Sequence, residues 1–186
     1  MIAALTLLAE QGPGNLDVAA INDAQYAVSS VCGACAEVTG PKGSLTVRIV
    51  DRCPGCKRGD LDLSRQAFAK IAVPAEGRVP IEWRLVSCAV AGPFTYDFAP
   101  GSSRYWLGLQ VRNARVPVKA LEWHSDGKWK PFELQNHNYF VVSSEVEAGP
   151  LRLRITGWEG QQVEDTLAAI KDKGSLVGKA QFAEVP

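Results

Sequence analysis

The sequence lacks a charge bias, long apolar runs and, in its first half, histidine. Twenty basic and twenty acidic residues give a formal net charge of zero, and the basic residues are scattered along the chain. Nucleic acids and acidic membrane surfaces attract clustered positive charge, so neither is expected as a partner. No apolar segment approaches the roughly 18 residues of a membrane-spanning helix.

The position of the histidines limits the chemistry that the first half of the chain can carry. Both of them, His124 and His137, lie in the second half. A His–Asp catalytic pair within the first half is therefore excluded. No nucleophile motif is present either, so esterase or protease chemistry has no support.

The first nine residues, MIAALTLLA, are apolar but do not resemble a secretory leader. They lack a basic lead and run directly into Glu10 and Gly12-Pro13. We interpret them as the first strand of the fold. Export from the cell must then be inferred from the cysteines instead.

Five cysteines are present, at Cys32, Cys35, Cys53, Cys56 and Cys88. The first four follow a C-x2-C-x17-C-x2-C spacing, which fits a structural zinc site. The fifth fits no four-ligand scheme, and each CxxC adjoins a β-rich segment that needs no metal to fold. Disulfides formed in an oxidising compartment are the alternative, and spacing alone does not give their connectivity.

The first half of the chain reads as short strands and one clear helix. A hairpin is predicted from residues 37–39 and 45–50 around the turn 40–43. Ser64 is a suitable N-cap for a helix over 65–71, which Val73-Pro74 stops. A further strand is expected over 79–88, and a second short helix around 21–27 has weaker support.

Beyond the stiff break Ala91-Gly92-Pro93, strands recur about every ten residues. This spacing is typical of a β-sandwich of about 90 residues. Asp126-Gly127 indicates a tight hairpin turn. We therefore expect two domains, residues 1–91 and 92–186. The strands predicted in the second are 94–98, 105–111, 118–123, 139–143 and 151–156.

Two acidic residues of the first half are candidates for function. Asp51 ends the apolar strand Val47–Val50, and Asp62 lies in the alternating segment 60–64, where Asp60 and Asp62 share one side. In one interpretation Asp62 caps the following helix and Asp51 caps a turn. In the other they form a polysaccharide site. Glycoside hydrolysis needs two carboxylates roughly 5–9.5 Å apart, and the sequence does not set this separation.

Aromatic residues are the candidates of the second half. Alternation along 104–112 places Trp106 on the polar face beside the small Gly108, where its flat indole suits stacking on a sugar ring. Packing of Trp106 against the other domain is the alternative. Tyr105 points inward by strict alternation, but it stands at the strand start, where twist exposes side chains. The remaining tryptophans are expected to be core or partly buried: Trp83, Trp123, Trp129 and Trp158.

Several segments together resemble microbial expansins, over nearly the whole chain and in the same order. In the first half these are residues 33–35, 38–43, 50–54 and 60–64, with Phe68 and Trp83-Arg84. In the second half they are 101–106 and 110–113. The resemblance implies an all-β chain: a six-stranded double-psi β-barrel followed by an immunoglobulin-like β-sandwich that binds carbohydrate.

The resemblance also implies a function and residues for it. Expansins are secreted proteins that loosen plant cell walls without hydrolysis, by disrupting contacts among cellulose and matrix glycans. A monomer without metal or cofactor is expected. Asp62 matches the family's essential acid and Asp51 its nearby acid. Tyr105 and Trp106 match two of three aromatics on the binding face, and the third aligns with His137 or, after a small shift, with Tyr139.

Related barrels imply a disulfide pattern as well. It pairs Cys35 with Cys88 and leaves Cys32 to bond Cys53 or Cys56. Cys53 also marks a departure, because bacterial relatives often carry a tyrosine at this point after the nearby acid. We expect the family's first strand to be absent here or replaced by residues 1–9.

Two rival functions stay open. The first is an enzyme, either an inverting endoglucanase or a peptidoglycan lytic transglycosylase, that uses Asp62. The second is an inert polysaccharide-binding module. Cellulose and other plant cell-wall glycans are the expected ligands, with peptidoglycan as a further candidate.

Overall fold

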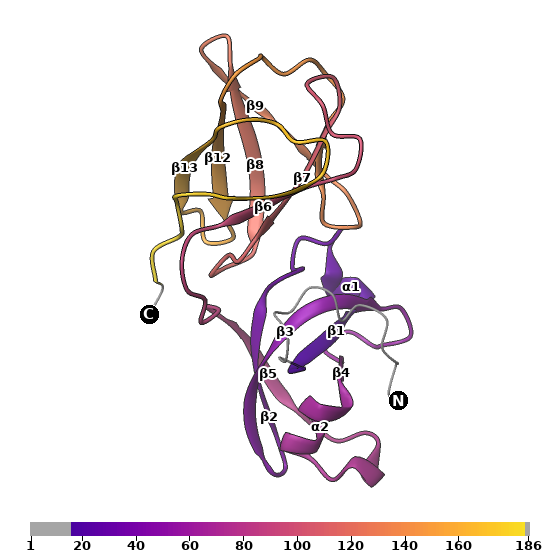
Figure 1. The fold of residues 1–186 in the computed structure, drawn as a ribbon. Coiled ribbons are helices and arrows are strands. Elements are labelled where there is room, and N and C mark those ends of the chain that lie inside the picture. Colours follow the sequence, from indigo (N-terminus) through magenta and orange to yellow (C-terminus); the bar gives the residue numbers. More distant parts are fainter. Residues whose placement is uncertain (1–15, 185–186) are drawn as a thin grey trace. The chain divides into compact units, whose positions relative to one another are not determined.

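The computed structural model describes residues 16–184, which form two compact units (Figure 1). The described residues of the first unit are 16–27 and 31–87, and those of the second are 28–30 and 88–184. The strand predicted at residues 1–9 lies outside the described residues. Among the described residues, the helices are few and short and all belong to the first unit, so the prediction of an all-β chain is confirmed. In the described range, no helix is long and apolar enough to span a bilayer.

The first unit is built on a five-stranded sheet with the order β4-β1-β3-β2-β5. Strands β1 and β3 pair in parallel, and the other neighbours are antiparallel. The elements of this unit are β1 (Val18–Asn22), α1 (Asp23–Tyr26), β2 (Cys35–Gly40), β3 (Gly43–Cys53), β4 (Leu61–Leu63), α2 (Arg65–Ile71), a 3-10 turn (Pro74–Glu76) and β5 (Glu82–Val86).

The β2–β3 hairpin and helix α2 form as the sequence predicts. Gly40 and Gly43 close the hairpin, and a side chain at Gly40 would lie 2.9 Å from the carbonyl oxygen of Ile71. Ser64 caps α2, because its Oγ accepts a hydrogen bond from the amide of Ala67 at 3.1 Å. The helix is thereby packed on the hairpin and buries Ala67 and Ile71 in the core of the first unit.

The second unit is a sandwich of two sheets. One has the order β10-β11-β7-β6-β14 and the other β13-β12-β8-β9, with antiparallel pairing throughout. Its strands are β6 (Thr95–Phe98), β7 (Leu107–Arg112), β8 (Val118–Ser125), β9 (Lys128–Pro131), β10 (Glu133–Leu134), β11 (Phe140–Val142), β12 (Leu151–Gly157), β13 (Gln162–Leu167) and β14 (Gly174–Val177).

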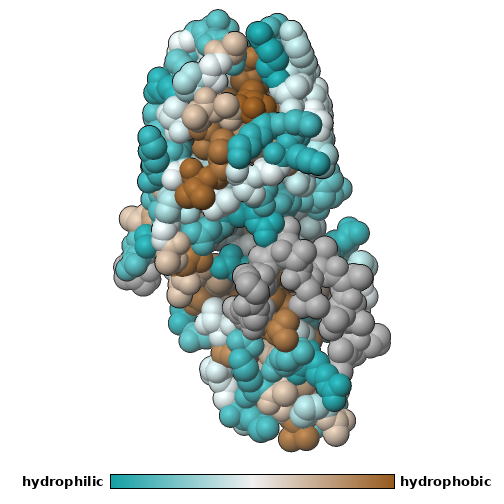
Figure 2. Space-filling view, in the orientation of Figure 1, coloured by the Kyte–Doolittle hydropathy of each residue, from teal (hydrophilic) through white to brown (hydrophobic). Residues whose placement is uncertain are grey.

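Alternating side chains of the two sheets meet in one apolar core. Leu107 and Leu109 of β7, Leu121 of β8 and Leu153 of β12 are completely buried in it. On the face drawn in Figure 2, the apolar residues that reach the surface of this unit gather in one band bordered by hydrophilic ones. The Asp126-Gly127 turn joins β8 to β9, as predicted.

One prediction about the tryptophans is wrong. Trp123 is buried and Trp83 and Trp129 are partly buried, but the side chain of Trp158 is 40% exposed. Trp158 lies in the β12–β13 turn, where its amide donates a hydrogen bond to the carbonyl oxygen of Pro117 at 3.1 Å. A turn residue held by its backbone does not need to bury its side chain.

Candidate polysaccharide-binding site

The two candidate acids of the first unit lie in one row across the sheet. Ala20 of β1 pairs with Asp51 of β3 on one side and with Asp62 of β4 on the other. Residues directly opposite one another in a sheet point to the same face, so both carboxylates flank the small methyl of Ala20. Two strand spacings of about 4.8 Å place their Cα atoms roughly 10 Å apart.

A β-bulge decides which face Asp51 occupies. Ala19 pairs with Ile49, but Ala20 pairs with Asp51, so Val50 is an extra residue in β3. If β3 continued in regular alternation with Val50 opposite Ala20, Asp51 would share the face of Ile49, which is completely buried. The bulge turns the carboxylate away from the core, as bulges near functional sites commonly do. The sequence carries a signal for this bulge, because the charged Asp51 lies two positions after the core residue Ile49, where regular alternation would place another core residue.

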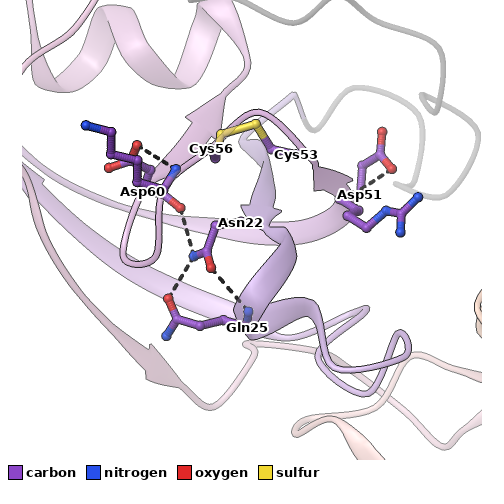
Figure 3. The surroundings of a disulfide bond; sticks show 8 residues. Asn22, Gln25, Asp51, Cys53, Cys56 and Asp60 are labelled. Carbon is purple, nitrogen blue, oxygen red and sulfur yellow. Dashed lines mark hydrogen bonds between the residues drawn. A yellow bond between two sulfur atoms is a disulfide. The ribbon is translucent and has the colours of Figure 1, made fainter.

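The structure separates these acids from the capping roles considered for them. Asp62 lies within β4, and the N-cap of α2 is Ser64. Asp51 lies within β3, is exposed to solvent, and accepts a hydrogen bond from the amide of Arg52 at 2.7 Å (Figure 3). Asp62 is half-buried.

The segment between the two acids is held in place by a polar network. The buried Asn22 donates to the carbonyl oxygen of Asp60 at 3.2 Å and to the side chain of Gln25 at 2.7 Å. Gln25 in turn accepts from the amide of Gly59 at 3.0 Å, and the indole of Trp83 donates to the carbonyl oxygen of Gly59 at 2.7 Å. Sequence reasoning did not identify these supports, because they join residues that are far apart in the chain.

The carboxylate of Asp60 serves this segment too. It accepts a hydrogen bond from the amide of Lys57 at 3.1 Å and so closes the turn before β4. A carboxylate that accepts from a backbone amide two or three residues away stabilises a turn. We therefore assign Asp60 a structural part beside the candidate acids Asp51 and Asp62.

The cysteines of the first unit correct one predicted pairing. Cys53 and Cys56 form a disulfide with each other (Figure 3), so the expectation that Cys32 bonds either of them is wrong. A bond between residues three apart satisfies both sulfurs locally. Cys35 and Cys88 are both disulfide-bonded, as the resemblance implies for these two residues.

The disulfides also bear on the zinc interpretation. Zinc is bound by thiolates, and three of the four cysteines of the C-x2-C-x17-C-x2-C pattern are in disulfides. Within residues 16–184, no three His, Cys, Asp or Glu side chains are grouped so that they could hold a metal ion. The pattern therefore does not act as a four-thiolate site.

The second unit carries an aromatic surface that we call the aromatic platform, defined as Tyr105, Trp106, His137 and Tyr139. Gly108 of β7 makes room for it: a Cβ there would lie 3.3 Å from Cη2 of Trp106 and 3.6 Å from Cδ1 of Tyr139. The rings of Trp106 and Tyr139 thus both lie against a sheet position without a side chain. The imidazole of His137 meets the ring of Tyr139 edge-on, with centroids 5.3 Å apart.

The loop before β7 exposes the first two aromatics. Because β7 begins at Leu107, Tyr105 and Trp106 precede the regular alternation, and their side chains are 64% and 37% exposed. The Oγ of Ser103 accepts from the amide of Tyr105 at 3.3 Å and from that of Trp106 at 3.4 Å. The guanidinium of Arg104 lies 5.4 Å from the centroid of the Tyr105 ring and pairs with Glu145.

The loop before β11 supplies the other two. Gln110 of β7 donates from its side chain to the carbonyl oxygen of His137 at 3.0 Å, and the amide of Gln135 donates to the carbonyl oxygen of Tyr139 at 2.8 Å. Asn138 between the two aromatics has a φ of 61°, a left-handed conformation that asparagine tolerates better than most residues. The resemblance aligned the third aromatic with either His137 or Tyr139, and the structure places both rings side by side.

An ionisable pair lies inside the same unit, away from the platform. Tyr96 donates a hydrogen bond to the buried Asp165 at 3.0 Å, and burial first, then the Asp165 charge, raises the pKa of the tyrosine above its ordinary value. Asp165 also accepts from the amides of Lys179 and Ala180 at 3.0 and 3.2 Å. This arrangement fastens the C-terminal segment to both sheets and has no evident part in binding.

Comparison with known proteins gives consistent relatives for both units. A family model described as lytic transglycolase matches residues 14–83. Expansin-YoaJ of Bacillus subtilis (strain 168) is 39% identical over 181 residues, which cover 92% of this chain and 78% of that protein. Expansin-B3 of Arabidopsis thaliana is 29% identical over 170 residues, 80% of this chain and 64% of that protein.

Solved structures agree with these relatives. The crystal structure of Clavibacter michiganensis expansin without ligand aligns with a TM-score of 0.82 and 30% identity, over 91% of this chain and 84% of that one. An aspartate-to-asparagine mutant of the same protein, in complex with cellohexaose, aligns equally well. The predicted double-psi β-barrel and β-sandwich are thereby confirmed as the fold. From the identity and coverage of these matches, the chain belongs to the expansin family.

Proposed function

We propose that this protein binds cellulose and related cell-wall glycans on its aromatic platform and loosens their non-covalent contacts without cleaving them. The observation that carries the proposal is the pair of rings, Trp106 and Tyr139, lying against Gly108 with Tyr105 exposed beside them. Flat aromatic rings add apolar contact area to the C–H face of a sugar at little cost in ordering entropy. The solved relative in complex with cellohexaose supports a β-linked glucan as the ligand.

Asp51 and Asp62, which we call the acid row, supply polar groups that can contact the glycan during loosening. Asp51 and Asp62 share one face of the first unit's sheet, and Asp62 is half-buried in a segment that Asn22 and Trp83 hold in place. We propose that Asp62 hydrogen-bonds a displaced glycan chain and that Asp51 assists it. Such binding displaces a glycan chain from its neighbours only to the extent that the protein binds the displaced chain more tightly than the packed chain.

The second candidate is glycan cleavage, and one observation favours it. The two carboxylates lie on one face, and their Cα atoms are roughly 10 Å apart, a backbone separation that is compatible with the about 6.5–9.5 Å between the carboxyl groups of inverting glycosidases. The family model for residues 14–83 carries a lytic enzyme's description. In that scheme the half-buried Asp62 would serve as the general acid and the exposed Asp51 as the base. The matches to expansins cover both units, however, whereas the family model of the lytic enzyme covers only residues 14–83. We therefore prefer the non-hydrolytic function.

Secretion and a monomeric state belong to the same proposal. The Cys53–Cys56 disulfide, together with the bonded Cys35 and Cys88, is typical of proteins that fold in an oxidising compartment. Insoluble wall polysaccharides lie in that compartment as well. Plant cell walls are the expected target, and peptidoglycan is the alternative to be compared in binding assays.

The test is binding to insoluble cellulose by a Trp106→Ala variant and a matched control. Trp158 provides the control, because its side chain is 40% exposed against 37% for Trp106 and lies in the β12–β13 turn. We expect Trp106→Ala to lose most of the bound fraction and Trp158→Ala to bind like the unmodified protein. Equal binding by Trp106→Ala, or equal losses in both variants, would reject the platform as the binding surface.

A further inference from the structure

The Cys53–Cys56 disulfide lies where strand β3 ends and the segment leading to β4 begins. Cys53 is the last residue of β3, two positions after Asp51, and Cys56 precedes Asp62 by six positions. The bond therefore lies within the segment that connects the two candidate acids. Figure 3 shows it between the two flanking carboxylates, with Asp51 on one side and Asp60 on the other.

The fold does not depend on this bond. The chain entropy that a cross-link removes from the unfolded state grows with the enclosed loop, and residues only three apart enclose a minimal one. The same segment is also tied by hydrogen bonds that involve no sulfur, from Asn22 to Asp60 and from Trp83 to Gly59. Opening the disulfide would therefore leave the sheet intact and release mainly the turn that follows Cys53.

The surroundings of the sulfurs favour exchange with an external thiol. Both cysteines are partly exposed, and Arg52, Lys57 and Arg58 are exposed cations close to them in the chain. Positive charge stabilises a thiolate and so makes a cysteine a better leaving group. Three carboxylates lie in the same region. Asp51 and Asp60 accept hydrogen bonds from the amides of Arg52 and Lys57, and Asp23 pairs with the Arg52 guanidinium at 3.3 Å. The positive charge nearest the sulfurs in the chain therefore comes mainly from Lys57 and Arg58.

We propose that Cys53–Cys56 is a thiol–disulfide exchange site, opened by a dithiol reductant in the folded protein, whose oxidation state sets the order of the segment between the two acids. A thiolate of the dithiol attacks one sulfur, the Cys53–Cys56 bond breaks, and the other sulfur leaves as a thiolate. The second thiol of the reductant then resolves the mixed disulfide. Two electrons and two protons pass from the dithiol to the protein, which leaves two cysteine thiols and an oxidised reductant.

The consequence for function rests on the function proposed above. With the bond closed, the turn before β4 is fixed relative to β3, and Asp62 keeps its place in the row with Asp51. With the bond open, that turn is held by hydrogen bonds, namely those of Asn22, Gln25 and Trp83 and those between Asp60 and Lys57. Reducing conditions would then weaken the contribution of the acids while leaving the aromatic platform unchanged.

The test uses the oxidised full chain in graded mixtures of reduced and oxidised dithiothreitol. Thiols are alkylated and assigned by peptide mass spectrometry, and near-ultraviolet circular dichroism reports whether the fold persists. We expect Cys53 and Cys56 to be alkylated together at a ratio of reduced to oxidised reagent at least tenfold lower than Cys35 and Cys88 require. Alkylation only after those two, or only with loss of the dichroism signal, would overturn the proposal.

Hydrogen exchange then measures the order of the segment. In the reduced protein and in a Cys53→Ser/Cys56→Ser variant, the amides of Lys57 and Gly59 should exchange at least tenfold faster than in the oxidised protein. The amide of Lys42, which donates to the carbonyl oxygen of Ile71 at 2.8 Å, is the control and should not change. Unchanged exchange at Lys57 and Gly59 would also overturn the proposal. Neither measurement needs a glycan, so a failure of the proposed wall function would appear separately, as absent binding by the oxidised protein.

Discussion

Gly108 gives the sharpest test of how the platform is built. An alanine there has no backbone strain to overcome, because Gly108 is not among the glycines with positive φ. Its Cβ, however, would lie 2.9 Å from the Cβ of Ala99 and 3.3 Å from Cη2 of Trp106. Ala99 or the backbone of β7 must therefore move, and the ring of Trp106 must shift by a few tenths of an ångström.

The expected size of the effect follows from these contacts. Overpacking of this kind costs about 1–3 kcal/mol of folding free energy. A Cβ at position 108 would be in ordinary contact with Tyr139, so only the ring of Trp106 is displaced. If this ring loses about 0.5–1.5 kcal/mol of contact with the sugar, Gly108→Ala should bind cellulose about 2- to 13-fold more weakly. Depletion isotherms on insoluble cellulose measure the affinity, and urea unfolding measures the stability.

A matched glycine controls for the substitution itself. Gly55 also has no positive φ, and a Cβ there would meet nothing within 4 Å. Gly55→Ala should therefore bind cellulose and unfold like the original protein. If Gly108→Ala also binds normally, the rings do not lie on the sheet as a binding surface, and the reasoning about the platform is refuted.

Two further predictions concern the supports of the two units. Tyr96→Phe should lower the unfolding free energy at pH 7 by about 1.5–3 kcal/mol, because the charged Asp165 loses a buried donor. Burial raises the pKa of Tyr96, so its contribution is present below the ordinary tyrosine pKa of about 10 and is lost as the pH rises above it. The difference in unfolding free energy between the original protein and Tyr96→Phe, measured in urea, should therefore be smaller at pH 11 than at pH 7. An equal difference at both pH values would contradict this. Deleting Val50 should remove the bulge without turning Asp51 inward, because Asp51 then follows Ile49 directly and lies opposite Ala20 in regular alternation. In urea unfolding this deletion should cost no more free energy than deleting an exposed residue of the same unit, Ala75. A cost several kcal/mol larger, as expected for a buried charge, would refute the interpretation of Val50 as the extra residue.

Much of the fold could be predicted from local patterns. The β2–β3 hairpin, helix α2 with its Ser64 cap, and the Asp126-Gly127 turn all follow from turn chemistry and capping within a few residues. Strands β13 and β14 were not predicted. Asp165 interrupts the apolar alternation of β13, and its burial makes sense only once Tyr96 and the amides of residues 179 and 180 surround it.

The candidate site divides in the same way. Alternation predicted the exposure of Trp106, but in the structure Trp106 is exposed because it lies in the loop before β7, as Tyr105 does. The placement of Tyr139 against Gly108 depends on how β11 pairs with β7. The acids were identifiable as residues, but their common row depends on a bulge and on two strand pairings across Ala20. The disulfide pattern that the resemblance implies is wrong in one part: Cys35 and Cys88 are bonded, but Cys53 and Cys56 bond each other instead of Cys32. Spacing alone could not have shown this, because it does not determine which sulfurs meet.

The most direct test of the central claim combines two readings on one sample. Isolated plant cell-wall strips are held under constant load with the protein, and their extension is recorded while soluble reducing ends are assayed in the surrounding buffer. Asp62→Asn is run in parallel, with cellulose binding checked for both proteins. Our account predicts extension without sugar release, and loss of extension in Asp62→Asn with binding retained. Reducing ends that increase with protein concentration and disappear in Asp62→Asn would instead show that the acid row cleaves glycans.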